Sequence, residues 1–181
     1  MVLLYEKNTE VKIMNKAVIV INGAGGVGKD TLCSLAEKHF RVRTISTITP
    51  IKEIAAMCGW DGSKDDKSRK FLADMKQLTV AYNDFPTNWA LNIFREFLNT
   101  DEEILFVHIR EPEEIAKFIK ATDGYAKALL VRGGSRMKKS HYGNYADDSV
   151  ENYEYDYCFM NDKSIAETET AFCALLRDIL A

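Results

Sequence analysis

Short runs of almost wholly apolar residues recur along the chain and alternate with longer segments whose apolar residues return every three or four positions. A short apolar run is typical of a strand buried on both faces, and the longer pattern is typical of a helix with one apolar face. The predicted strands lie at residues 17–22, 43–47, 103–109, 127–132 and 156–161. This alternation predicts one α/β domain in which helices cover both faces of a parallel sheet.

Prolines mark the starts of several predicted helices. Thr49 and Pro50 fit the N-cap and first residue of one helix, and two more begin near Pro86 and Pro112. The polar segment 61–70 is either a connection or the exposed start of the next helix. That helix has an apolar stripe at helical spacing, made of Phe71, Leu72, Met75, Leu78 and Tyr82. A closing helix follows the last strand.

Composition excludes several classes of protein. With 181 residues, 46% hydrophobic and 28% charged, the chain fits a single globular domain, and its net charge of −3 argues against nucleic-acid binding through a basic face. No apolar run approaches the length of a membrane span. The four cysteines, Cys33, Cys58, Cys158 and Cys173, lack metal-binding spacing, so we expect buried, reduced thiols. We therefore expect a cytoplasmic protein with a domain at residues 17–181, preceded by an extension at 1–16.

The segment "INGAGGVGKDTL" (21–32) carries the clearest chemical signal. Residues 23–29 satisfy G-x-x-x-x-G-K between a predicted buried strand and a predicted helix. Glycines let consecutive backbone amides turn toward an anion, the helix adds its positive end, and the lysine adds a mobile charge for the β- and γ-phosphates. The predicted nucleotide-binding residues here are Gly23, Ala24, Gly25, Gly26, Val27, Gly28 and Lys29.

Two other interpretations of this loop are weaker. A tight turn needs one or two glycines, and would not need a lysine at the correct spacing. Gly23, Gly25 and Gly28 also match the dinucleotide-binding pattern G-x-G-x-x-G, which calls for an acidic residue ~20 positions later. The corresponding segment, "RVRTISTITP", contains no acid, and Lys29 would have no role.

Asp30 occupies the position where this motif usually has serine or threonine, whose hydroxyl binds Mg²⁺. A carboxylate can hold Mg²⁺ or its water shell instead, and Thr31 supplies a hydroxyl one position later. Asp30 and Thr31 are therefore the predicted metal-binding residues. The alternative is that Asp30 only stabilises the helix N-terminus through the helix dipole.

The loop "GAGGVGKDT" resembles that of P-loop nucleoside monophosphate kinase-like proteins, especially phage-type deoxynucleoside monophosphate kinases, and animal-type phosphomevalonate kinases share its Gly-Lys-Asp. "SRKFLADMKQL…NWALN", "FVHIREPEE" and "YDYCFMNDKSIAETE" resemble further segments of that family, in the same order. The resemblance implies a P-loop NTPase fold with three α/β/α layers and a five-stranded parallel sheet in the order 2-3-1-4-5. It also implies a helical acceptor region at about 49–100 and a lid-like segment at about 132–155.

The resemblance further implies roles for individual side chains. Arg69 and Arg110 match positions that bind the acceptor phosphate, Arg132 and Arg136 match lid arginines, with Lys138 and Lys139 nearby, and Asn161 matches the turn beside the nucleotide base. His108 stands where the family has an acid that orients the waters of Mg²⁺. Whether the chain is catalytically competent is left open by this departure.

These patterns predict an ATP- and Mg²⁺-dependent phosphotransferase acting on a small phosphorylated acceptor, foremost a (deoxy)nucleoside monophosphate. A kinase for a phosphomevalonate- or dephospho-coenzyme A-like acceptor is one alternative. Another is a regulatory protein that binds the nucleotide without transferring phosphate. Neither a nucleic-acid polymer nor a membrane is expected as a partner, and the sequence does not predict an oligomeric state.

Overall fold

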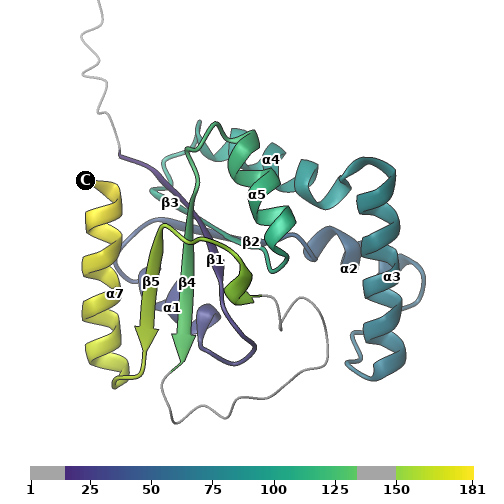
Figure 1. Cartoon of the computed structure of the whole chain (residues 1–181), viewed down its shortest axis with the longest axis horizontal. Coiled ribbons are helices and arrows are strands. Elements are labelled where there is room, and N and C mark those ends of the chain that lie inside the picture. Colours follow the sequence, from purple (N-terminus) through teal and green to yellow (C-terminus); the bar gives the residue numbers. More distant parts are fainter. Residues whose placement is uncertain (1–14, 134–149) are drawn as a thin grey trace, which may run out of the picture.

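The computed structural model describes residues 15–133 and 150–181, and its centre is a parallel sheet (Figure 1). The strands are β1 (Ala17–Asn22), β2 (Val42–Ser46), β3 (Ile104–His108), β4 (Lys127–Gly133) and β5 (Tyr157–Asn161). Their order across the sheet is β2-β3-β1-β4-β5, with all neighbours parallel. The predicted strand order is confirmed, and no strand end differs from its prediction by more than a residue.

The described helices are α1 (Lys29–Ala36), α2 (Thr49–Met57), α3 (Asp66–Asn83), α4 (Phe85–Phe97), α5 (Pro112–Ala121) and α7 (Ile165–Leu180), with a 3₁₀ turn, η1, at Val150–Asn152. The polar segment 61–70 contains the start of α3, because Asp65 caps that helix by accepting a hydrogen bond from the Ser68 amide. The N-cap prediction for Thr49 is wrong. Ile48 is the N-cap residue of α2, and Thr49 is already helical and caps nothing.

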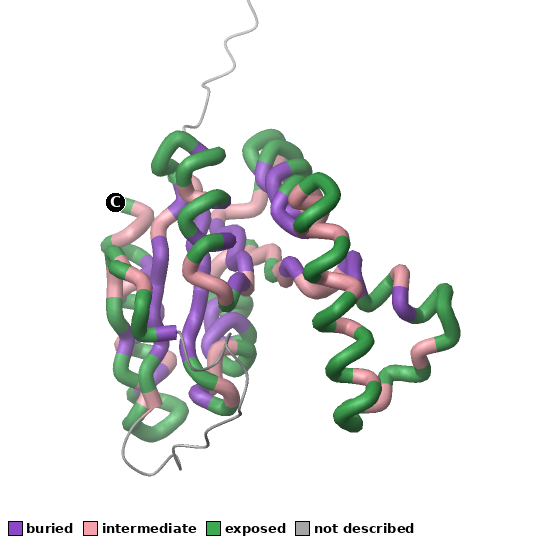
Figure 2. The backbone as a smooth tube through the Cα atoms, turned by 45° about the vertical axis from the view of Figure 1, so that its right-hand side comes forward, coloured by how far each residue is buried: buried purple, intermediate pink, exposed green. Residues whose placement is uncertain are grey.

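Side chains that alternate along the central strand build a core on each face of the sheet. Ala17, Ile19 and Ile21 pack with α1 and α7, whereas Val18 and Val20 pack with α4 and α5. In Figure 2 the strands are buried, and the helices on either side of them are exposed on their outer surfaces. Helices therefore cover both faces of the sheet, which confirms the predicted three-layer α/β/α architecture.

Helices α2 and α3 extend to the side of these layers (Figures 1 and 2). α3 packs against α2 and α4 but contains no buried residue. Its apolar stripe remains largely uncovered, with Leu78 71% and Tyr82 86% exposed. The spacing of a stripe thus predicts a helix correctly without showing whether another element covers it.

Two expectations from the sequence are only partly met: the burial of all four cysteines, and the extent of the N-terminal extension. Cys33 and Cys173 are buried, but Cys58 and Cys158 are exposed, because Cys58 ends α2 and Cys158 faces outward on the edge strand β5. Of the predicted extension, residues 1–14 lie outside the described part. Lys16 belongs to the fold, since its ammonium donates to the carbonyl oxygens of Phe97, Thr100 and Glu102 at 2.7–2.9 Å.

Within the described ranges, no helix has the length and apolar character needed to cross a membrane.

Candidate active site

The glycine loop joins the buried end of β1 to the start of α1 and requires glycine at specific positions. Gly23 has φ +148°, and a Cβ there would lie 2.3 Å from the carbonyl oxygen of Val131 on β4. Gly28 has φ +88°, and a Cβ there would lie 2.5 Å from Nδ2 of Asn161. Both positions thus combine a left-handed φ with a close neighbour, which no other residue type tolerates without strain.

Lys29 is directed back into this loop. Its Nζ donates hydrogen bonds to the carbonyl oxygens of Gly23 (2.5 Å) and Ala24 (3.0 Å). α1 begins at Lys29, and no side chain caps its first turn. A helix N-terminus attracts anions through its partial positive charge and its amide groups. The loop therefore places an ammonium group and the positive end of a helix together, as phosphate binding requires.

Asn161, at the end of β5, braces the loop from the other side. Its Nδ2 donates to the carbonyl oxygen of Val27 at 2.9 Å, and its Oδ1 accepts from the Thr168 hydroxyl at 3.4 Å. The resemblance placed Asn161 beside the nucleotide base, and the structure shows it in contact with the loop that would hold the phosphates. A direct contact with the base stays a prediction.

Asp30 and His108 meet beside the loop. Asp30 is fully exposed on the first turn of α1, and its Oδ1 lies 3.9 Å from Nδ1 of His108 at the end of β3. Burial lowers the pKa of His108 below its ordinary 6.5, against the opposing effect of Asp30, so its ring is neutral at pH 7. Asp30 is therefore a carboxylate adjacent to the strand end at which the kinases that the sequence resembles have an acid.

Behind His108, the sulfur of Cys33 lies 3.7 Å from Nε2 of the ring. Burial raises the pKa of this thiol to about 12, so it stays protonated and unreactive at neutral pH. No group of three His, Cys, Asp or Glu side chains able to hold a metal occurs in the described ranges. A metal at this site would depend on Asp30, the Thr31 hydroxyl next to it and non-protein oxygens.

The predicted arginines are distributed over three elements. Arg69 is exposed on α3, and Arg110 is exposed two residues after the end of β3. Arg132 is exposed near the end of β4 and pairs with Glu151 through two hydrogen bonds, one of them 3.1 Å from Nε to Oε1. Arg136, with Lys138 and Lys139, lies outside the described residues.

Sequence reasoning missed Asn22, the last residue of β1. Its side chain is fully buried and donates to the carbonyl oxygen of Arg110 (3.0 Å) and to the Tyr155 hydroxyl (2.8 Å), while its Oδ1 accepts from the Gly23 amide (2.8 Å). The Tyr155 hydroxyl in turn donates to the carbonyl oxygen of Val150. The sequence did contain a signal for this role, because Asn22 is a polar residue at the end of an otherwise apolar strand, just before the glycines.

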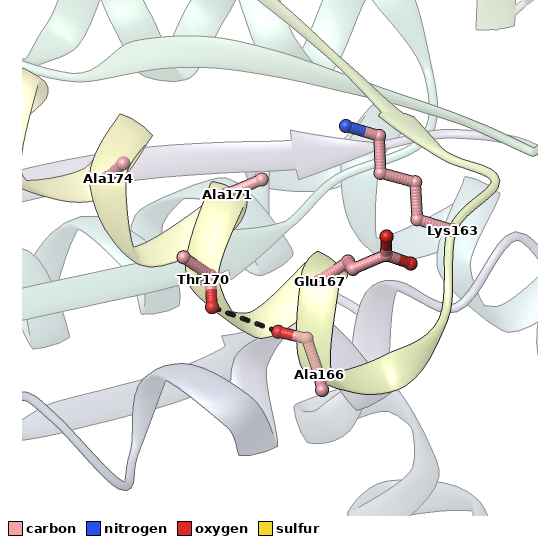
Figure 3. Close-up of a pocket in the computed structure, with 6 residues that line it drawn as sticks. All are labelled: Lys163, Ala166, Glu167, Thr170, Ala171 and Ala174. Atoms are coloured by element: carbon pink, nitrogen blue, oxygen red, sulfur yellow. Dashed lines mark hydrogen bonds between the residues drawn. The ribbon is translucent and has the colours of Figure 1, made fainter.

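A shallow groove follows α7, and no residue of the glycine loop lines it (Figure 3). Small side chains account for its shape, and its charged members are Lys163 and Glu167. Glu167 completes the capping box with Ser164 at the start of α7, and Thr170 bonds to the backbone of Ala166. These groups serve the helix itself, so we assign no ligand to this groove.

Solved structures of other proteins share this fold over most of their length. A tunicamycin resistance protein from Deinococcus radiodurans is 9% identical, with 89% of this chain and 95% of that chain covered and a TM-score of 0.57. TT1252 from Thermus thermophilus is 16% identical, with 91% and 98% covered and a TM-score of 0.53. A gluconokinase from Sinorhizobium meliloti 1021 is 16% identical, with 92% of this chain and 94% of that chain covered, but its TM-score of 0.47 is too low to show a shared fold.

No protein-family model and no curated protein matches the chain. At such low identities the structural similarities show the fold alone. The strand order and the glycine loop between β1 and α1 nevertheless define the class of fold, which is that of the P-loop NTPases.

Proposed function

We propose that the chain is an ATP-dependent phosphotransferase whose acceptor is a small phosphorylated molecule, foremost a (deoxy)nucleoside monophosphate. The observation that carries the proposal is the glycine loop, where Lys29 is turned into the loop at the uncapped start of α1. The resemblance to nucleoside monophosphate kinase-like proteins supports this choice of acceptor.

The residues of the loop fit the donor phosphates. Backbone amides of the loop and of the first turn of α1 would donate to the phosphate oxygens, and Lys29 would exchange its carbonyl partners for the β- and γ-phosphates. Asp30 and Thr31 offer the oxygen ligands that Mg²⁺ prefers, and Mg²⁺ would neutralise charge on the transferring group. Asn161 would hold the loop in place through the Val27 carbonyl.

Arginines would serve the acceptor. Arg69 and Arg110 would bind its phosphate, because a guanidinium group offers parallel N–H donors to two phosphate oxygens. Arg132 would exchange Glu151 for the transferring group. Such catalysis consists mainly of holding donor and acceptor in line and stabilising charge, so it requires no covalent contribution from the protein.

A second function is favoured by one observation. His108, neutral at pH 7, stands where a carboxylate would otherwise add negative charge to the Mg²⁺ site. A chain that binds ATP through the loop but transfers no phosphate would act as a nucleotide-dependent regulatory protein.

An assay of ADP production separates these functions. The acceptors tested are the ribo- and deoxyribonucleoside monophosphates, phosphomevalonate and dephospho-coenzyme A. Turnover with a nucleoside monophosphate supports the proposal. Turnover with phosphomevalonate or dephospho-coenzyme A would show a kinase with a different acceptor, and tight ATP binding without turnover favours the regulatory protein. Lys29→Ala should abolish most turnover while circular dichroism stays unchanged. Wild-type ATP affinity and turnover in this variant would contradict the assignment of the phosphate site.

A further inference from the structure

A charged cluster fastens α3 to the start of α5. Nζ of Lys76 lies 2.6 Å from Oε2 of Glu111 and 3.0 Å from Oε2 of Glu114. The Lys76 side chain is only 12% exposed and that of Glu114 only 9%. Glu111 is the N-cap residue of α5 and Glu114 lies in its first turn, so the helix dipole adds to the attraction that holds both carboxylates.

This contact is unusual for its surroundings, because α3 buries no residue of its own. The other ion pairs of this helix and its end are exposed: Lys70 pairs with Asp74 within α3, and Asp84, just after it, pairs with Lys117 of α5. Exposed pairs contribute little to holding elements together, whereas removing one partner of a buried pair is costly. Lys76 is thus the main charged attachment that the described structure gives α3.

The cluster also joins the two segments that carry the arginines assigned to the acceptor. Glu111 directly follows Arg110 in the chain. Arg69 precedes Lys76 by two helical turns on α3, so both residues project from the same side of the helix, about 10 Å apart along its axis. An ion pair between Lys76 and Glu111 therefore fixes the helix that carries Arg69 relative to the segment that carries Arg110.

We propose that Lys76 is a positioning residue for the acceptor: through Glu111 and Glu114 it sets the separation of Arg69 and Arg110 and so determines how tightly an acceptor phosphate is held. This inference rests on the proposed phosphotransferase function. Lys76 itself contacts no substrate in this scheme. Its loss should weaken acceptor binding and leave the donor loop between β1 and α1 unaffected.

Lys76→Met is the test, with Lys70→Met as the matched control, since Lys70 lies on the same helix and its partner among the described residues is the exposed Asp74. Using the nucleoside monophosphate that the wild type phosphorylates fastest, we expect Lys76→Met to raise the acceptor KM at least ~10-fold, because displacements of about 1 Å have effects of this size. The ATP KM should stay within about twofold, and Lys70→Met should match the wild type in both.

Two further measurements separate positioning from stability. Hydrogen exchange across 66–83 in the nucleotide-free protein should accelerate in Lys76→Met and not in Lys70→Met. Adding Glu111→Gln and Glu114→Gln to Lys76→Met removes the unpaired buried charges, and should recover the Tm but not the acceptor KM.

The outcomes distinguish the two proposals. An unchanged acceptor KM or unchanged exchange of α3 in Lys76→Met overturns the positioning role and leaves the proposed function standing. Recovery of both Tm and acceptor KM in the triple variant also overturns it, since the cluster would then act only through stability. If the wild type phosphorylates no nucleoside monophosphate, the proposed acceptor fails, and the role of Lys76 toward it fails with it.

Discussion

Replacing Gly28 by alanine tests whether the loop and Asn161 fit together as the structure shows. Gly28 has φ +88°, and a Cβ there would lie 2.5 Å from Nδ2 of Asn161. Gly62 is a matched control: it has φ +89°, but a Cβ there would have no neighbour within 4 Å. The two substitutions impose the same backbone strain and differ in whether a side chain is in the way.

The expected loss in the free energy of unfolding follows from these contacts. A left-handed φ costs an alanine roughly 1–2 kcal/mol in the folded state, and this cost applies at both positions. At Gly28 the Asn161 amide must also move, which breaks its 2.9 Å hydrogen bond to the Val27 carbonyl. A hydrogen bond of this kind contributes about 1 kcal/mol. Gly28→Ala should therefore lower the free energy of unfolding by about 1 kcal/mol more than Gly62→Ala does.

Urea denaturation without nucleotide measures both values, and a double-mutant cycle with Asn161→Ala identifies the cause. In the Asn161→Ala background the obstructing amide is absent, so Gly28→Ala should cost no more than Gly62→Ala. Equal losses for the two glycine variants in the wild-type background would refute the reasoning. So would an excess loss at Gly28 that persists after Asn161 has been truncated.

Five other variants test the site and the charged cluster. Asp30→Ala should raise the Mg²⁺ concentration needed for tight ATP binding, and Asp30→Ser should restore part of the affinity. If the Mg²⁺ titrations of the wild type and both variants superimpose, Asp30 has only a helix-dipole role, worth about 0.3–1 kcal/mol of stability. Arg69→Lys or Arg110→Lys should raise the acceptor KM more than the ATP KM, because lysine lacks the guanidinium fork, and an unchanged acceptor KM in both would remove them from the acceptor site. Burial raises the pKa of Glu114 above its ordinary 4.5, so just above pH 4.5 the folded state retains a proton that the unfolded state releases. The stability of the wild type, measured by urea unfolding, should therefore fall relative to that of Glu114→Gln as the pH rises above 4.5. Stability curves that stay parallel for the two proteins would contradict this.

The sequence predicts the sheet well because a strand buried on both faces leaves a direct trace, as the apolar run of β1 does. It also predicts the phosphate loop, whose glycine spacing reflects backbone conformations that other residues avoid. Contacts between distant segments leave no such trace. Nothing near Asn22 indicates that its amide would meet Tyr155, and nothing near Lys76 indicates that Glu111 would face it.

Exposure is equally hard to infer from a pattern. The stripe through Leu78 and Tyr82 has the periodicity of a core helix, yet both side chains are largely exposed because no described element covers that side of α3. Cys158 is exposed for a related reason, since β4 is the one partner of β5 among the described strands and β5 lies at an edge of that sheet. Both outcomes depend on which elements become neighbours, and a local pattern does not contain that information.

The central position of β1 has a consequence for synthesis of the chain. Of the strands that the structure describes, β1 is made first, but its partners come much later: Ala17 pairs with Ile104 and Ile19 pairs with Lys127. Gly23 also packs against the Val131 carbonyl. The phosphate loop therefore cannot take its final shape on the ribosome until β4 has emerged. A nascent chain that ends before β4 should not be retained on immobilised ATP, so retention would mark the point at which the sheet closes around its first strand.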